Sequence, residues 1–361
     1  MMADDKLTIE ALDDDKPIPL EPTMPAEIAS PLAVFGGAKP PAPKWFEAAL
    51  ADQPERTFVE AAGANIEMLT WGERGKPGLI FVHGNSAHAD WWSFIAPFFA
   101  KDWRVASVSL SGMGDSDWRD TYSFETFATE MWECAKAAGH YDNGMLPIYV
   151  GHSFGGSQVY YSAARYPERM KGALLVDTGF GGPPTAEQID AWRKEAEERA
   201  KATGEPMPDM SQWSRGPSQT NRPNRVYPTL EAALMRFRFM PPQVPGNLYV
   251  ADWIARKSLK RAPLADGSGE GWTWKFDPGL WSKLDRSAMN EVSNQNAAPM
   301  AHIYGDNSNI MRRHPGSSGS SMIPADAPHV VIPDSEHHIM VDQPLALVAA
   351  IRTLLTVWPK A

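Results

Sequence analysis

Cysteine is nearly absent from this chain, because Cys134 is the only one among 361 residues. A single thiol excludes an intramolecular disulfide, so nothing indicates an oxidising compartment. Long apolar runs are absent too, and no uninterrupted stretch approaches the roughly 18 residues that a membrane-spanning helix needs. The acidic start, MMADDKLTIEALDDDK, lacks the apolar segment of a secretory signal. We therefore expect a cytoplasmic protein with no membrane insertion.

Clustered positive charge is also scarce. The 34 Lys and Arg are outnumbered by 44 Asp and Glu, which gives a formal net charge of −10. Binding to nucleic acid requires Lys and Arg gathered on one surface. The one compact basic cluster, Arg312-Arg313-His314, is too short to provide such a surface. The composition therefore argues against a nucleic-acid partner.

The chain divides into three kinds of sequence. Residues 1–55 are rich in Pro, Ala and acid, which predicts an N-terminal extension that is partly extended or wraps the rest. Trp45 and Phe46 begin a short amphipathic helix that would anchor this extension. Residues 56–180 and 298–361 form the core, and residues 181–297, with many Pro, Arg and Trp, predict a mainly helical cap inserted into it.

The core sequence alternates between two patterns. After an early hairpin at 57–71, apolar runs predict buried strands at 78–83, 104–110, 146–151, 172–177, 300–305 and 329–334. Helical spacing follows at 122–139, 154–166 and 344–358. This alternation indicates an α/β fold whose mostly parallel sheet is covered by helices on both faces.

A G-x-S-x-G motif, GHSFG, lies between the strand at 146–151 and the helix at 154–166. Strand, turn and helix in this order are the context in which the motif indicates a nucleophile on a sharp elbow. Gly151 and Gly155 let neighbouring backbone pass close by, and the helix N-terminus favours negative charge at Ser153. An ordinary Gly-rich turn is the alternative interpretation.

A nucleophilic serine also needs donors for the oxyanion. The segment FVHGNSAHADWW, residues 81–92, runs from a strand through His83-Gly84 into a loop, and we expect a helix from about Ala89. The backbone N–H groups of Asn85 and Phe154 are the predicted oxyanion hole. The His83 side chain is expected to hydrogen-bond the loop.

The general base is expected after the last strand, in SEHHIMVDQP, where His337 is favoured over its neighbour His338. No acid or histidine sits at ligand spacing to complete a metal site with this pair, so no metal is predicted. Two residues are candidates for the acid that orients the base. Asp177 ends the strand at 172–177 and is favoured, whereas Asp306 follows Gly305 and comes early in its turn.

Together, the His-Gly loop, SLSGMGDSD at 109–117, GHSFGG and HHIMVDQP resemble the α/β-hydrolase superfamily over residues 56–361. Ser111 stands where the family usually has proline. The resemblance implies an eight-stranded, mostly parallel sheet with a cap after the sixth strand. The place of Asp177 is similar to that of the acid in haloalkane dehalogenases, but those enzymes attack with aspartate, so their chemistry and that of epoxide hydrolases are not expected here.

The cap is rich in tryptophan, and most of these side chains are expected to form its own core: Trp192, Trp213, Trp253, Trp272, Trp274 and Trp281. Trp253 and Trp274, with Trp91 and Trp92 beside the oxyanion loop, are the candidate pocket residues and favour a hydrophobic or aromatic group. Cap arginines could bind a substrate carboxylate, although solvated arginines are the simpler interpretation: Arg222, Arg225, Arg236 and Arg238.

Three functions fit this sequence. The first is a carboxylesterase that works through an acyl-enzyme on Ser153, needs no cofactor, acts on a small-molecule ester and could form a homo-oligomer. The second is a C–C bond hydrolase of ring-cleavage products, or a lactonase, with the same triad. The third is a ligand-binding protein on this fold without catalysis.

Overall fold

The computed structural model describes residues 25–142, 144–179, 223–292, 297–312 and 326–356, with isolated positions at 194, 197 and 201. Its centre is an eight-stranded sheet in the order β1-β2-β4-β3-β6-β7-β11-β12. The strands are β1 (Glu55–Ala61), β2 (Ala64–Trp71), β3 (Gly78–Val82), β4 (Arg104–Val108), β6 (Ile148–His152), β7 (Gly172–Val176), β11 (Met300–Gly305) and β12 (His329–Ile332).

Strand direction follows the sequence pattern. The hairpin β1–β2 and the pair β2–β4 are antiparallel, and the remaining neighbours are parallel. Parallel strands buried on both faces require continuous apolar runs, and all five residues of β3 and of β7 are buried. The predicted α/β-hydrolase type of sheet, with eight mostly parallel strands, is confirmed.

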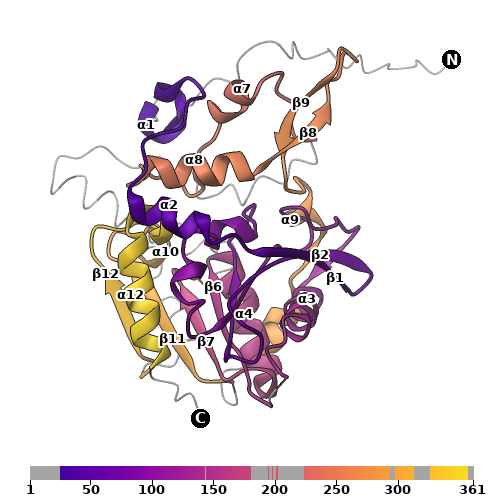
Figure 1. Ribbon diagram of the computed structural model, residues 1–361, viewed down its shortest axis with the longest axis vertical. Coiled ribbons are helices and arrows are strands. Elements are labelled where there is room, and N and C mark those ends of the chain that lie inside the picture. The colour runs from indigo at the N-terminus through magenta and orange to yellow at the C-terminus, as the bar shows by residue number, and fades with distance from the viewer. Residues whose placement is uncertain are drawn as a thin grey trace.

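Helices cover both faces of the sheet, as Figure 1 shows. Leu79 and Phe81 of β3 pack in one core cluster with α12 (Pro344–Leu355), whereas Ile80 and Val82 pack in the other with α3 (Phe124–Ala137) and α4 (Phe154–Arg165). Successive side chains of a strand point to opposite faces, so a single run of apolar residues fills both layers.

The part of the insertion that the structure describes forms a lobe above the sheet (Figure 1). The lobe contains the helices α7 (Leu230–Leu234) and α8 (Leu248–Lys257). They are followed by α9 (Leu280–Lys283) and β10 (Leu284–Asp285), and β10 pairs with β5 (Tyr122–Ser123).

An antiparallel hairpin in this lobe was not predicted. It pairs β8 (Leu259–Pro263) with β9 (Glu270–Trp274). The turn carries Asp266-Gly267 with Gly267 at φ +71°, and Trp272, Thr273 and Trp274 favour a pleated strand. Trp192, Trp213 and Arg222 lie outside the described residues.

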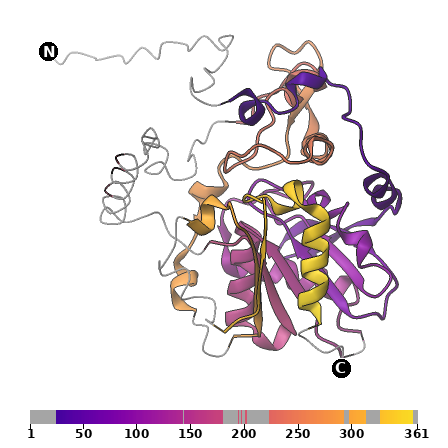
Figure 2. The same ribbon diagram turned by 90° about the vertical axis from the view of Figure 1, so that its left-hand side faces the viewer.

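The N-terminal segment runs beside both the lobe and the core. It contains α1 (Ala26–Ala29), η1 (Ala33–Phe35) and α2 (Lys44–Ala51), and Figure 2 shows it in indigo passing from the lobe down to the level of the sheet. The predicted helix at Trp45 and Phe46 is present as α2. The Phe46 ring contacts Phe94 of the core at 5.5 Å between centroids and Tyr249 of the lobe at 4.9 Å.

The remaining short elements surround the ends of the strands. They are η2 (Ala89–Trp92), η3 (Ala96–Phe98), η4 (Pro167–Arg169), η5 (Ser287–Glu291), α10 (Asn309–Arg312) and α11 (Ile339–Asp342). The helix expected from Ala89 is therefore a single 3₁₀ turn. Among the residues described here, none of the helices is long and apolar enough to cross a bilayer.

Candidate active site

Ser153 lies at the turn between β6 and α4, with φ +52° and ψ −118°. A positive φ is strained for serine, and such strain clusters at functional sites. The Ser153 N–H donates to the carbonyl of Val176 at 3.0 Å, which ties the turn to the neighbouring strand β7. The Ser153 hydroxyl therefore stands at the carboxyl edge of the sheet and at the N-terminus of a twelve-residue helix.

Close backbone contacts explain the glycines of the elbow. A Cβ atom on Gly155 would lie 2.2 Å from the carbonyl oxygen of His83, and one on Gly151 would lie 2.6 Å from the carbonyl oxygen of Gly155. Neither distance is compatible with a side chain, and both neighbours are backbone atoms that cannot rotate away. The spacing of the motif thus reflects how tightly α4 packs against the ends of β3 and β6.

His337 bridges Ser153 and Asp177. Its Nε2 atom is 2.9 Å from Ser153 Oγ, and its Nδ1 atom is 2.6 Å from Asp177 Oδ2. A carboxylate only accepts, so Nδ1 carries the proton and Nε2 is free to accept the serine proton. Asp177 is fully buried at the end of β7. The base His337 is therefore within hydrogen-bond distance of both the predicted nucleophile, Ser153, and the favoured acid, Asp177.

The two alternative residues make other contacts. Asp306 Oδ1 accepts the backbone N–H of Ser335 at 3.3 Å. The His338 ring is buried and its Nδ1 atom bonds Gln243 Oε1 at 2.5 Å. Burial, followed by the proximity of His337, lowers the pKa of His338 well below its usual value. The geometry therefore favours Asp177 over Asp306 and His337 over His338.

The loop that carries His337 is held on both sides by polar groups that are buried or half-buried. The N–H of Glu336 donates to Asp342 Oδ2 at 2.9 Å, and the N–H of His338 donates to Gln243 Oε1 at 2.9 Å. The carbonyl of His337 bonds His152 Nε2 at 3.0 Å. Gln243 also donates to Asp342, which links the insertion to this loop. These contacts of Asp342 and Gln243 were not predicted from the sequence.

The turn that contains Asn85 lies against the elbow. A Cβ atom on Gly84 would approach Ser153 Cβ to 3.3 Å, so the backbone just before Asn85 passes beside the nucleophile. His83 fixes this turn, because its Nδ1 bonds the Gly84 carbonyl at 2.7 Å and its Nε2 accepts the Leu110 N–H at 3.0 Å. Burial lowers the pKa of His83 to about 4. The His83 side chain is thus a neutral structural group.

The four tryptophans predicted for the pocket have different environments. The Trp91 ring lies 5.6 Å from His338 and 6.0 Å from Phe239, close to the histidine loop. Trp92 is instead fully buried against Phe81 and belongs to the core, because the 3₁₀ turn directs neighbouring side chains to different sides.

The other two tryptophans of that prediction make structural contacts. Trp253 donates to the Asp90 carbonyl at 3.2 Å, and Trp274 packs against Phe237 within the insertion at 6.2 Å. An aromatic pair that the prediction did not include lies beside the elbow, where the Trp281 ring stands 5.4 Å from that of Phe154.

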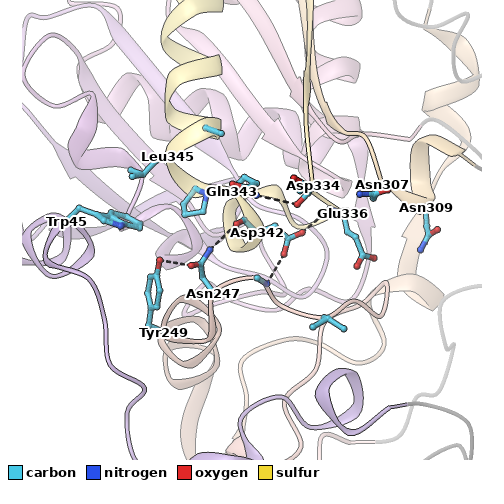
Figure 3. Close-up of a pocket in the computed structure, with 14 residues that line it drawn as sticks. Trp45, Asn247, Tyr249, Asn307, Asn309, Asp334, Glu336, Asp342, Gln343 and Leu345 are labelled. Carbon is cyan, nitrogen blue, oxygen red and sulfur yellow. Dashed lines mark hydrogen bonds between the residues drawn. The ribbon is translucent and has the colours of Figure 1, made fainter.

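A polar cavity of about 780 Å³ adjoins the histidine loop and is drawn in Figure 3. Trp45 and Tyr249 form one wall, and Glu336, Asp342 and Asp334 lie along the other. None of Ser153, Asp177 and His337 lines it. The cavity is therefore separate from the candidate active site, and we connect it only with the anchoring of the histidine loop by Asp342.

Comparison with known families agrees with the fold. The family model of the α/β-hydrolase fold matches residues 77–344, and the chain belongs to this family. Esterase Rv0045c from Mycobacterium tuberculosis is 24% identical over 325 residues, which cover 84% of this chain and 89% of that protein. Human epoxide hydrolase 4 is 25% identical over 122 residues, a third of each chain.

Solved structures are similar over most of the chain. The crystal structure of esterase Rv0045c has a TM-score of 0.54 at 19% identity, covering 91% of this chain and 98% of that one. E-2-(acetamidomethylene)succinate hydrolase has a TM-score of 0.61 at 17% identity and covers 84% and 99%. At such identities these likenesses concern the fold alone.

Proposed function

We propose that the protein is a serine hydrolase that cleaves carboxylic esters through an acyl-enzyme on Ser153. The observation that carries this proposal is the hydrogen-bonded series from Asp177 through His337 to Ser153, with the serine on a strained elbow. Serine is a weak nucleophile unless an adjacent base takes its proton and a third group orients that base. The relationship to esterase Rv0045c supports an ester as the substrate.

In the proposed reaction, Ser153 Oγ attacks the ester carbonyl carbon while its proton passes to His337 Nε2. Asp177 holds the imidazole through Nδ1 and stabilises the imidazolium that forms. The carbonyl oxygen becomes an oxyanion and accepts the N–H groups of Asn85 and Phe154. Collapse breaks the C–O bond, and the alcohol leaves with the proton from His337. Water, activated by His337, then releases the acid and regenerates Ser153.

The proposed substrate carries a hydrophobic or aromatic group. Support comes from aromatic rings near the proposed nucleophile, with Trp281 packed on Phe154 and with Trp91 and Phe239 beside the histidine loop. We assign the role of a cap to the insertion, residues 181–297, since Gln243 within it contacts the histidine loop. Apolar pocket walls with few polar groups are typical of sites for such ligands.

Intact mass after treatment with a fluorophosphonate tests the proposal. Wild type is expected to gain one adduct, and Ser153→Ala none, because only a serine activated by a base reacts at a useful rate. A panel of aryl and alkyl esters, lactones and dienoate C–C substrates then follows with wild type. A preference for dienoates or lactones would instead favour the second function, a C–C bond hydrolase or a lactonase with the same triad.

Two aspartate variants serve as an internal control in the same labelling experiment. Asp177→Asn is expected to slow labelling about a thousandfold or more, since an amide at this position favours the wrong imidazole tautomer. Asp306→Asn is expected to label like wild type. A folded wild-type protein that takes up no fluorophosphonate and hydrolyses nothing in the panel would contradict the proposal and favour a binding protein.

A further inference from the structure

The carboxylate of Asp177 has a second side-chain partner besides His337. Its Oδ2 atom accepts from His337 Nδ1 at 2.6 Å and also from Ser308 Oγ at 2.6 Å. Its Oδ1 atom accepts the N–H of Gly305 at 3.2 Å. Gly305 ends β11, the strand beside β7, and Ser308 lies in the turn that follows it. The end of the neighbouring strand and its turn thus supply these two donors.

Ser308 is fully buried, as is Asp177. A buried carboxylate requires donors on its oxygens, and hydrogen bonds to a charged group are stronger than those between neutral groups. The terminal torsion of an aspartate has a broad minimum, so one contact with His337 would leave the carboxylate free to rotate. Contacts at both oxygens, from Ser308 and from Gly305, define its plane.

From this arrangement we infer that Ser308 is a positioning residue, which holds Asp177 Oδ2 towards His337 Nδ1. The inference rests on the proposed function, because it assigns Ser308 a role in the same triad. Ser308 acts through Asp177 and touches neither the serine nor the substrate. Because its hydroxyl and the imidazole share one oxygen, the loss of Ser308 changes the hydrogen bond between Asp177 and His337 itself.

The inference distinguishes Ser308 from an ordinary buried serine. Ser335 offers the matched comparison, because it is also buried and lies in the loop that carries His337. Its hydroxyl donates to the Glu336 carbonyl at 3.4 Å, not to Asp177. A Ser→Ala change at either position removes one buried hydroxyl, but only the change at 308 alters the environment of Asp177.

The test compares Ser308→Ala and Ser335→Ala with wild type by two measurements. In Ser308→Ala, kcat on the best ester of the panel is expected to fall about tenfold, with KM within about twofold. The downfield proton resonance of the His337 Nδ1–H is expected to shift or broaden. Ser335→Ala is expected to keep both wild-type values. Ser308→Cys, with a weak S–H donor of similar size, is expected to lie between Ser308→Ala and wild type, and it replaces Ser308→Ala if that variant does not fold.

The outcomes separate this inference from the proposed function. If Ser308→Ala matches Ser335→Ala in kcat and in the resonance, the positioning role is wrong even though the hydrolase proposal stands. If wild type has no turnover that depends on Ser153 and the resonance still changes in Ser308→Ala, the hydrolase proposal fails and the positioning of Asp177 stands. If neither turnover nor a change in the resonance is found, both fail.

Discussion

The elbow and the histidine loop meet at the same site but are held by different kinds of contact. At the elbow, backbone passes so close to backbone that positions 151 and 155 have no room for a Cβ atom. At the histidine loop, side chains hold the backbone on either side of His337: Asp342 accepts from Glu336, and Gln243 accepts from His338. One region depends on shape and the other on polar anchors.

This difference has two consequences. At the elbow, backbone atoms pack directly against backbone atoms, so no side-chain rotation can make room for an added methyl group. Such a group displaces the whole turn. Polar anchors act one by one, and the loss of each has a limited cost. The elbow also lies entirely within the core, whereas Gln243 belongs to the insertion. We therefore expect the loss of the Gln243 contact to shift His337, whereas core contacts continue to hold the backbone of the elbow.

The largest effect is expected from Gly155→Ala. The new Cβ atom would lie 2.2 Å from the His83 carbonyl oxygen and 2.8 Å from that of Val82, so α4 or β3 must move. We expect a loss of about 3 kcal/mol in the free energy of unfolding. We also expect kcat/KM to fall about a hundredfold, because misplacing a reacting group by about 1 Å has effects of that size. Urea unfolding and ester hydrolysis measure the two.

Gly63→Ala is the matched control for this variant. Gly63 has a φ of +75°, but a Cβ atom there has nothing within 4 Å. The substitution is therefore expected to cost about 1 kcal/mol of stability through backbone strain and to leave kcat/KM unchanged. Gly155 lies in α4 and has no positive φ, so equal effects of the two substitutions would show that the structure relieves the close approach at 155 at little cost.

A smaller effect is expected from Gln243→Leu, which removes the anchor contributed by the insertion. The His338 N–H and the Asp342 carboxylate each lose a partner, which is expected to cost about 2 kcal/mol of unfolding free energy. His337 then loses one support of its loop, and we expect kcat/KM to fall about tenfold with fluorophosphonate labelling slowed in parallel. Gln53→Leu, at an exposed position shortly after α2, is expected to behave like wild type. Normal activity in Gln243→Leu would mean that Asp342 and His152 suffice to hold the loop.

The elbow was predicted from the sequence, whereas the contacts that hold the histidine loop were not, because those contacts join residues that are far apart along the chain. Gly151, Ser153 and Gly155 are neighbours, and their spacing alone reports the steric demand of the turn. Gln243 and His338 are 95 residues apart, and Ser308 and Asp177 are 131 apart. Nothing local to Gln243 or Ser308 indicates a partner, so these contacts emerge only when the strands are placed side by side.

The sequence could not decide between Asp177 and Asp306 as the acid for the same reason. Asp177 and Asp306 follow adjacent strands, β7 and β11, so both were open from the sequence. Only the twist and register of these strands determine that Asp177 faces His337, while Asp306 turns to the backbone of Ser335. The hairpin β8–β9 was missed for another reason, since tryptophans in a Pro-rich and Arg-rich segment carry no clear periodicity.

The smallest effect is expected from pH, because two buried imidazoles lie beside His337, that of His152 in the elbow and that of His338 in the histidine loop. Burial is the main cause that lowers the pKa of His152 and of His338 well below the usual 6.5, and proximity to His337 adds to it. Unfolding returns both rings to water, so below pH 6.5 the unfolded chain binds more protons than the folded one.

The free energy of unfolding is therefore expected to fall as the pH drops from about 6.5 towards 4, by up to about 1.4 kcal/mol per pH unit for each such histidine. His83, with its pKa lowered to about 4, adds to the same trend. His338→Asn should reduce the slope by up to one proton, whereas the exposed control His329→Asn should leave it unchanged. Urea titrations between pH 4 and pH 8 measure the slope. An unaltered slope in His338→Asn would mean that the ring becomes protonated within the fold.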